Sequence, residues 1–302
     1  MDILTIFTAT FNRCELLPRL YESLKKQTTK NFEWIVIDDG STDDTADYMM
    51  RIASIEDTFS IRFVRQPHGG KHRALNAGFD LAKGEFFFPV DSDDYLLDDA
   101  VEKINTWIDS IKDNRDFIGV SGLKITESEI VIGGNPNINR GEYIDASVFE
   151  RNKYGLMGDK AEIWRTSACK RNKFPEFDGE YFLTEAVCWE AISANGEKVR
   201  WFNEPIYVCE YLDDGLTKSG ANDLKGHIEN YKGYCYYIRQ SLRFRTGEEW
   251  ARLIYSYYRE SKKMGVGIAT QAEKVNVAIM KYVLDLLMAI LLLAFIKIRK
   301  MA

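Results

Sequence analysis

Short apolar runs alternate with amphipathic segments along the first 110 residues, and this alternation constrains the fold more than any other feature. Strand-type runs cover residues 3–7, 32–37, 61–64 and 85–90. Helix-type segments cover residues 13–27, from 41 or 42 toward 53, 72–82 and about 97–111. Strands that alternate with helices pair in parallel and carry helices on both faces of the sheet. We therefore expect an α/β fold with a mainly parallel, twisted sheet flanked by helices.

The second half of the chain has a looser pattern. Residues 142–165 mix turns with short segments, residues 181–194 predict a helix, and residues 199–210 predict one or two strands broken by Pro205. Residues 224–263 have a helical pattern that is rich in tyrosine. Because aromatic side chains dominate burial, we expect these helices to form a packed core rather than a ligand site.

The C-terminal segment is apolar and then basic. Residues 282–296 contain one charged side chain, Asp285, and are followed by Lys297, Arg299 and Lys300. At ~1.5 Å per residue this run falls short of a ~30 Å hydrocarbon core. We therefore expect a helix that lies in the membrane interface with its basic residues on anionic head groups. The alternative is a buried packing or dimer helix.

Composition narrows the class of protein. The 302-residue chain has 40 Lys and Arg against 46 Asp and Glu, whereas a nucleic-acid binder needs a basic surface, so we expect no nucleic-acid partner. The first apolar run is only of strand length, so we expect no secretory signal. The widely spaced cysteines lack metal-ligand spacing and predict reduced thiols in a cytosolic protein: Cys14, Cys169, Cys188, Cys209 and Cys235.

The sharpest chemical feature is the acidic run that follows the strand at residues 85–90. Asp91 and Asp93 are one residue apart, and such close carboxylates repel each other unless a cation lies between them. Hard divalent cations take oxygen ligands, so the pair predicts a metal site that keeps positions open for substrate phosphates. A calcium-binding EF-hand loop is excluded, because Leu96 stands where that loop needs glycine. A solvated acidic helix start is the other alternative.

Three further polar clusters belong to the same predicted sheet. Residues 8–13 close the first strand with small residues, an aromatic ring and a cation, and residues 38–43 close the second with carboxylates. Residues 68–73 combine two glycines with basic side chains before a helix, where backbone N–H groups favour phosphate. Because ligands of parallel sheets bind at the carboxyl ends of the strands, the clusters predict one shared site.

As a set, these motifs resemble glycosyltransferase family 2, the nucleotide-sugar-dependent enzymes with a GT-A fold. The matching residues are 10–13, 35–43, Gly70, 73–78 and 84–94. The resemblance is strong over roughly residues 3–110 and reaches about residue 215 more faintly. It implies a Rossmann-like nucleotide-binding half within the predicted sheet, and a helical C-terminal extension after the GT-A domain.

The resemblance implies a nucleotide site drawn from all four clusters: Thr10, Phe11, Asn12, Arg13, Asp39, Lys71, Asn76, Asp91 and Ser92. Thr10, Phe11 and Asp39 would hold the nucleoside. Lys71 and Asn76 would line the rest of the nucleotide site. The base would be uracil by family habit, with guanine and thymine left open.

The resemblance also implies a divalent cofactor. Asp93 would be the main ligand of a Mg²⁺ or Mn²⁺ ion that bridges the diphosphate, and Asp91 would touch the ribose or the same metal. Lys218, which follows the last sheet segment, would close over the diphosphate or remain a solvated loop lysine.

The family usually carries an acidic pair followed by a tryptophan on an acceptor-side helix. Aligning Trp189 with that tryptophan places Glu185 at the position of the catalytic carboxylate and Thr184 at that of its neighbour. This chain has Glu where the family more often has Asp. The resemblance implies Glu185 as the general base that deprotonates an acceptor hydroxyl. The rival carboxylates are Asp178, Glu180 and Glu190.

The predicted activity is an inverting, metal-dependent transfer of a sugar from a nucleotide-diphosphate sugar, with UDP as the expected nucleotide. The acceptor would be a hydroxyl of a glycan or a lipid-linked molecule in bacterial polysaccharide or envelope assembly, at the cytoplasmic face of the membrane. A homo-oligomer is possible in principle. Two alternatives are a sugar-activating nucleotidyltransferase, which would need a glycine-rich loop after the first strand, and an inactive membrane-bound scaffold.

The predicted domain order follows from these assignments. Residues 1–215 would form the catalytic domain, with the nucleotide-sugar-binding half at 1–110 and the acceptor-side half at 111–215. Residues 216–275 would form a helical, aromatic-rich extension, and residues 276–302 the membrane-associated helix.

Overall fold

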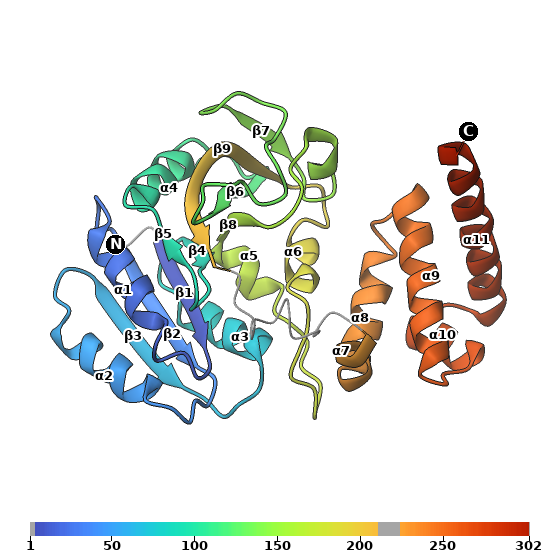
Figure 1. The fold of residues 1–302 in the computed structure, drawn as a ribbon, viewed down its shortest axis with the longest axis horizontal. Coiled ribbons are helices and arrows are strands. Elements are labelled where there is room, and N and C mark those ends of the chain that lie inside the picture. The colour runs from blue at the N-terminus through green and yellow to red at the C-terminus, as the bar shows by residue number, and fades with distance from the viewer. Residues whose placement is uncertain (1–3, 211–223, 302) are drawn as a thin grey trace. The chain divides into compact units, whose positions relative to one another are not determined.

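The structure is a computed structural model that describes residues 4–210 and 224–301 (Figure 1). The chain divides into two compact units. The sheet unit comprises Met1–Phe174 and Cys188–Gly215, and the helical unit comprises Pro175–Val187 and Leu216–Ala302. Residues 175–187 thus group with the C-terminal helices, although the residues before and after them in the sequence belong to the sheet unit.

The described strands form one mixed sheet in the order β3-β2-β1-β4-β8-β6-β9-β5, and β7 pairs with β9. Their bounds are β1 Leu4–Thr10, β2 Phe32–Asp38, β3 Ser60–Arg65, β4 Phe86–Pro89, β5 Tyr95–Leu96, β6 Phe117–Thr126, β7 Tyr143–Ala146, β8 Lys160–Arg165 and β9 Lys198–Cys209. β1 to β4 pair with one another in parallel, as the alternating pattern predicts. β8 then runs antiparallel to both β4 and β6. The predicted α/β class with a central sheet is confirmed.

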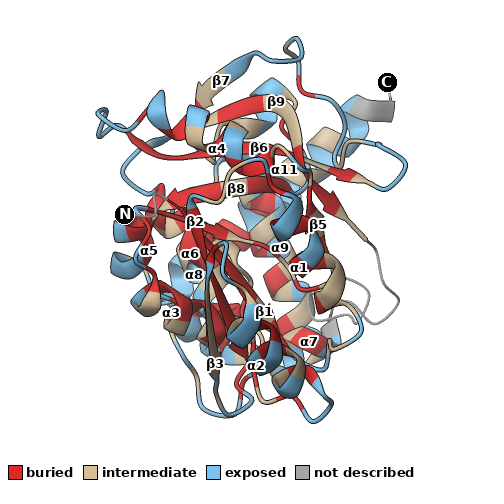
Figure 2. Ribbon diagram, turned by 90° about the vertical axis from the view of Figure 1, so that its left-hand side faces the viewer, coloured by how far each residue is buried: buried red, intermediate tan, exposed pale blue. Residues whose placement is uncertain are grey.

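The helices of the sheet unit cover both faces of this sheet. Their bounds are α1 Leu17–Lys26, α2 Thr45–Ile55, α3 Lys71–Leu81, α4 Ala100–Asp109 and α5 Thr166–Arg171, with a short 3₁₀ helix at Arg151–Tyr154. α1, α2 and α4 share one core with Leu4 and Trp34 of the strands. On the other face, Phe79 of α3 packs edge-on against Phe87 of β4, with ring centroids 4.8 Å apart. Figure 2 shows the strands as the most continuously buried part of the sheet unit.

Three predicted elements differ from the structure. The helix expected at residues 181–194 is α6, Ala186–Ile192, so it starts after Glu185. β9 continues through Pro205 as a single strand, because Pro205 lies at an irregularity in its pairing with β6, where a missing N–H is tolerated. The C-terminal helix α11, Ile279–Met301, is longer than the apolar run at residues 282–296 from which a short interfacial helix was predicted. By length and composition alone, its residues 279–299 could cross a membrane.

The helical unit has a core of its own. Its described helices are α7 Leu224–Glu229, α8 Tyr231–Ser241, α9 Gly247–Lys263, α10 Ile268–Lys274 and α11. Tyr234 of α8, Tyr257 of α9 and Tyr282 of α11 are buried together. The prediction that the tyrosine-rich helices form a packed core is therefore confirmed.

Candidate active site

Three neighbouring parallel strands end at one edge of the sheet unit. β1 ends at Thr10 beside Asp38 of β2, and β4 ends beside Phe7 of β1. The pairing continues one residue further, since the Asp39 N–H donates to the Thr10 carbonyl over 2.8 Å and the Val90 N–H to the Phe7 carbonyl over 2.8 Å. The polar clusters that follow these strands therefore lie next to one another, as predicted.

Asp39 is buried and holds the glycine-containing loop of residues 66–70. One carboxylate oxygen accepts from Gln66 Nε2 at 2.7 Å and from the Gly69 N–H at 3.0 Å. The other accepts from the Gly70 N–H at 2.7 Å and lies 2.9 Å from His68 Nδ1. Charge-assisted bonds of this kind are roughly twice as strong as neutral ones, so Asp39 fixes the loop in place.

This loop approaches the turn after β2 so closely that only glycine fits at position 40. Gly40 has φ +87°, and a Cβ there would lie 2.8 Å from the backbone nitrogen of His68. Both the left-handed backbone and the contact exclude a side chain. The close approach brings the His68 ring onto Phe11, with centroids 4.3 Å apart and planes at 23°.

The Phe11–His68 stack presents an aromatic surface at the edge of the sheet. Phe11 is 41% exposed and the His68 side chain 45% exposed. His68 was part of a predicted phosphate loop but not a predicted site residue. The sequence carried a signal for it only as one more basic residue beside two glycines.

The loop after β1 is anchored through its backbone. Asn12 has φ 52°, and its N–H donates to Ser41 Oγ at 2.8 Å while its side-chain oxygen accepts from the Thr42 N–H at 2.7 Å. The Arg13 N–H donates to Thr45 Oγ1 at 3.1 Å. Asn12 and Arg13 thus shape the loop that holds Phe11, and Thr10 lies buried beneath it.

The acidic run lies beside the start of α3. Lys71 Nζ is 2.5 Å from Asp91 Oδ1. Burial opposes ionisation of Asp91, but Lys71 and Lys124 outweigh it and lower the pKa of this carboxyl to about 2. Burial and the charge of Asp91 raise the pKa of Asp93. Ser92 between them is buried.

The two carboxylates fit a divalent cation that is completed by substrate. Among the described residues, the Asp93 carboxylate takes part in no hydrogen bond or ion pair with another residue. Over residues 4–210 and 224–301, no group of three or more His, Cys, Asp or Glu is arranged to hold a metal by itself. Mg²⁺ is commonly held by only one or two carboxylates together with phosphates and water, so Asp91 and Asp93 match that donor set.

A buried support fixes the acidic run from behind. The Asp91 N–H donates to Tyr207 Oη at 2.9 Å, and the Glu210 N–H donates to Asp94 Oδ1 at 2.9 Å. Lys124 Nζ lies 4.1 Å from the centroid of the Tyr207 ring. These contacts come from β6 and β9, whose pairing brings residues from far along the chain to this loop, so no local sequence pattern could have revealed them.

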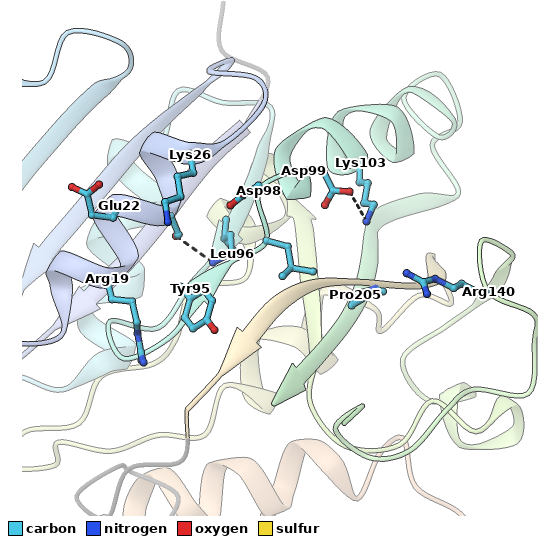
Figure 3. A pocket seen from close by; sticks show the side chains of 12 residues that line it. Arg19, Glu22, Lys26, Tyr95, Leu96, Asp98, Asp99, Lys103, Arg140 and Pro205 are labelled. Carbon is cyan, nitrogen blue, oxygen red and sulfur yellow. Dashed lines mark hydrogen bonds and ion pairs between the residues drawn. The ribbon is translucent and has the colours of Figure 1, made fainter. Parts of the chain in front are cut away.

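A pocket of about 690 Å³ lies on the other side of the acidic run, along α1, β5 and the start of α4 (Figure 3). Arg19 and Tyr95 stand at one end of it, and Lys103 and Arg140 at the other. None of the predicted site residues lines this pocket. Arg19 connects the two regions, because its guanidinium donates to the backbone carbonyl of Asp93.

Asn76 and Glu185 are not joined to this cluster by the hydrogen bonds described above. The Asn76 amide bonds the backbone of Phe174 in both directions, at 3.0 and 2.9 Å. Glu185 belongs to the helical unit, whereas the predicted nucleotide residues belong to the sheet unit. Trp189, on which the base was aligned, is buried and stacks on Trp164 with centroids 5.2 Å apart. Lys218 lies outside the described residues.

The rival carboxylates differ in their surroundings. Asp178 is exposed and Glu190 is buried. Glu180 is buried, and its two oxygens accept from the backbone N–H groups of Lys232 and Gly233. Glu180 is therefore engaged in holding α8.

The sequence of the sheet unit is similar to that of known proteins. The family model of glycosyl transferase family 2 matches residues 5–159, which is half of the chain and includes every predicted nucleotide-binding residue. The chain belongs to glycosyl transferase family 2. It is thus an enzyme of the glycosyltransferase class, which decides against the nucleotidyltransferase and the scaffold considered above.

Two curated family members illustrate the similarity. The chain is 25% identical over 265 residues to a Campylobacter jejuni GalNAc(5)-diNAcBac-PP-undecaprenol β-1,3-glucosyltransferase, covering 86% of this chain and 81% of the relative. It is 29% identical over 203 residues to the Escherichia coli UDP-Glc:α-D-GlcNAc-diphosphoundecaprenol β-1,3-glucosyltransferase WfaP, covering 66% of this chain and 74% of the relative.

Two solved structures share the fold. Staphylococcus aureus TarS in complex with UDP aligns with a TM-score of 0.60 and 18% identity, over 95% of this chain and 80% of that chain. A Pyrobaculum calidifontis mannosyltransferase in complex with GDP-Man and Mn²⁺ aligns with a TM-score of 0.53 and 16% identity, over 95% and 73%. GT-A proteins of this architecture therefore include one that holds Mn²⁺.

Proposed function

We propose that this protein transfers a sugar from UDP-sugar, with inversion, to a hydroxyl of a sugar carried on a polyprenyl diphosphate, in the assembly of a bacterial surface glycan. The observation that carries the proposal is the meeting of the Phe11–His68 surface, the Asp39-held loop and the Asp91–Asp93 pair at one sheet edge. The names of the two relatives, both glucosyltransferases acting on undecaprenol-linked sugars, support the acceptor class.

The donor would lie along this edge. We infer that the base stacks against Phe11 and His68, while Asp39 acts through the loop it holds, since Gln66, His68, Gly69 and Gly70 already surround its carboxylate. The N-terminus of α3 and Lys71 would face the diphosphate. Asn76 would act on the nucleotide site indirectly, because its side chain bonds the backbone of Phe174 and so holds α3 in place.

Asp93, with Asp91, would hold the Mg²⁺ or Mn²⁺ ion. A bound divalent cation neutralises charge on a leaving diphosphate. Glu185 would take the proton from the acceptor hydroxyl, which attacks the anomeric carbon from the face opposite the leaving UDP. One displacement of this kind inverts the configuration at that carbon.

The acceptor proposal agrees with the surface of α11. One stripe of the helix exposes apolar side chains along its length: Met280, Leu284, Leu287, Leu291, Phe295 and Ile298. The opposite face is buried in the helical unit through Tyr282 and Ala289. At about 100° per residue, Lys281 and Arg299 fall beside the stripe, where cations meet anionic head groups.

We propose that α11 lies in the plane of the inner membrane surface rather than across it. α9 packs along α11 and exposes Glu249, Arg252 and Arg259. A spanning α11 would draw these charges into hydrocarbon, which is unfavourable. A helix in the interface instead buries only its exposed stripe and leaves α9 in water.

Flotation with vesicles tests the membrane proposal. We expect binding to vesicles of phosphatidylcholine with phosphatidylglycerol, weaker binding at high salt, and loss of binding in a Leu284→Glu, Leu291→Glu variant. Ile268→Glu on α10 is the matched control and should bind normally. If instead the double variant floats like the wild type and a dimer becomes monomeric, the stripe is a contact between two copies of this chain.

A thermal-shift panel tests the catalytic proposal without knowledge of the acceptor. We expect UDP with Mn²⁺ to raise the Tm of the purified protein, and Asp93→Ala to abolish the metal-dependent part of the rise. GDP and dTDP serve as comparisons for the base. No stabilisation by any diphosphate would overturn the donor site. UDP release from UDP-glucose, with α-GlcNAc-diphospho-undecaprenol as acceptor, then tests transfer.

A further inference from the structure

The segment around Glu185 is attached to α8 on both sides of that residue. Residues 180–187, called the base segment here, belong to the helical unit. Glu180 and Asn230 join its beginning to the start of α8, and Gln240 joins its end to the last turn of α8. We call these three side chains the α8 clamp.

At its beginning, the clamp is a reciprocal exchange in which a buried side chain of each segment accepts from backbone N–H groups of the other. The Glu180 carboxylate accepts from the N–H groups of Lys232 and Gly233, both at 2.8 Å. Asn230, the residue before α8, accepts from the N–H groups of Tyr181 and Phe182 at 2.8 and 2.9 Å. The first N–H groups of a helix need partners from outside it, and here the base segment supplies them.

The exchange requires close approach of the two backbones. Glu180 is 7% exposed and Asn230 8% exposed, so both bonds are shielded from water. A Cβ on Gly233 would lie 3.1 Å from Leu183 Cδ1 and 3.2 Å from Glu180 Oε2. A side chain at position 233 would therefore require the Leu183 and Glu180 side chains to shift by a few tenths of an ångström.

At its end, the base segment is held by one bond. Gln240 Nε2 donates to the Val187 carbonyl at 2.7 Å. Between the two attachments, the Val187 N–H donates to the Thr184 carbonyl at 3.1 Å and closes a turn around Glu185. The backbone that carries Glu185 is thus fixed before and after it by a helix that follows it by about fifty positions.

We propose that the α8 clamp positions Glu185 for catalysis, so that the helical unit sets the geometry of the general base. This inference rests on the proposed function, in which Glu185 is the base. Gln240, Asn230 and Glu180 are positioning residues: they act on the reaction through the backbone of the base segment. A merely structural clamp would hold the helical unit together without any effect specific to turnover.

Gln240→Ala is the first test, because it removes one bond and leaves the Glu180–Asn230 exchange in place. We expect kcat for UDP release from UDP-glucose to fall about 10- to 100-fold, the cost of a small misplacement of a catalytic group. The KM for UDP-glucose and the Kd for UDP with Mn²⁺ should stay within about twofold, since weak coupling is expected to a site in the sheet unit. Normal kcat in this variant would overturn the inference.

Gln271→Ala is the control. Gln271 is a fully buried glutamine of the helical unit, whereas Gln240 is half-buried. Its Nε2 donates to the Val266 carbonyl at 2.6 Å and its Oε1 accepts from Tyr282 Oη at 2.8 Å, away from the base segment. We expect Gln271→Ala to lower the Tm at least as much as Gln240→Ala does while leaving kcat unchanged. An equal loss of kcat in both variants would mean that kcat follows the stability of the helical unit, and the clamp would have no positioning role.

The double variant separates the clamp from the base assignment. Glu185→Gln should by itself lower kcat about 10²- to 10⁴-fold. If Gln240 acts through Glu185, adding Gln240→Ala to Glu185→Gln should cost almost nothing more. Fully additive losses would overturn the clamp and leave the base in place. A normal kcat in Glu185→Gln would overturn the base assignment, and with it the proposed mechanism. Glu180→Ala, if it folds, should behave as Gln240→Ala does.

Discussion

Asp39 in the sheet unit and Glu180 in the helical unit use the same device. Each is a buried carboxylate that accepts two consecutive backbone N–H groups from a distant segment, and in both cases the second is a glycine, Gly70 or Gly233. Asp39 holds a loop on the proposed donor side, and Glu180 holds the segment of the proposed base. Under the proposed function, one kind of contact would serve binding in one unit and turnover in the other.

The largest expected effect comes from the acidic pair, which lies on the donor side only. Asp93→Asn should lower transfer about 10³-fold, because a Lewis acid supplies several kcal/mol to a leaving group. The free energy of unfolding of the Asp93→Asn variant should equal or exceed that of the wild type, since burial and the charge of Asp91 already disfavour the charged form of Asp93. UDP release and Tm measured on the same preparation check this. A drop in Tm with unchanged transfer would contradict the metal role.

The next effect tests the comparison directly. Asp39→Ala and Glu180→Ala each remove a carboxylate that accepts from two backbone N–H groups, and Asp39 also loses Gln66 and His68, so both should lose stability by at least about 1.5–3 kcal/mol. Asp39→Ala should also weaken UDP binding about tenfold through loss of the preformed loop. Glu180→Ala should leave UDP binding intact and lower kcat.

Denaturant titration and calorimetry of UDP binding measure the two effects separately. Asp80→Ala and Glu229→Ala, which remove exposed acids from the same units, are the controls and should change neither quantity much. If Glu180→Ala weakened UDP binding as strongly as Asp39→Ala does, the division between binding and turnover would fail.

A smaller effect is expected at Tyr207, the support behind the acidic run. Tyr207→Phe leaves the partly buried N–H of Asp91 without its partner, which should cost about 1 kcal/mol of stability. The looser run should raise the Mn²⁺ concentration for half-maximal transfer a few-fold. Tyr143→Phe, at a 49% exposed tyrosine of the same unit, is the control. An unchanged metal requirement would show that the run is rigid without Tyr207.

The smallest effect is expected at Lys160, a buried side chain that donates to backbone carbonyls, whereas Asp39 and Glu180 accept from backbone N–H groups. Lys160 Nζ donates to the Ile132 carbonyl at 2.8 Å and to that of Met157, and burial, with Arg151, lowers its pKa to about 8. Between about pH 8 and 10 the unfolded chain therefore binds more protons than the folded one, so stability should rise with pH. We expect the difference between the Tm of the wild type and that of Lys160→Met to increase by a few degrees in favour of the wild type as the pH rises through this window.

Local sequence spacing places the proposed donor-side residues at the sheet edge, whereas it does not place the proposed base, for a physical reason. Asp39, Asp91 and Asp93 each follow the end of a strand within four residues, so local spacing places them at the edge of a parallel sheet. The parallel order of β1 to β4 followed from the same alternation. Pro205 within β9 and the late start of α6 were missed, since strand irregularities and tertiary contacts override local pattern.

The residues that support the site could not be predicted from the sequence, for a different reason. Tyr207 meets Asp91 across 116 positions, and Gly233 meets Glu180 across 53. A glutamate, a tyrosine or a glycine has no local signature for such a contact. Glu180 was considered only as a rival base, because its charge was visible in the sequence and its partners were not.

The stack of Phe11 on His68 has a consequence for how such an enzyme changes over generations. The fold of this edge depends on Asp39, Gly40 and the backbone of the loop, whereas the Phe11 ring is largely outside that framework. Substitutions at position 11 can therefore accumulate without unfolding the site. In the proposed function, where the base stacks against this ring, a population of such chains could change its contact with the base by single steps at position 11 while every member keeps the same scaffold.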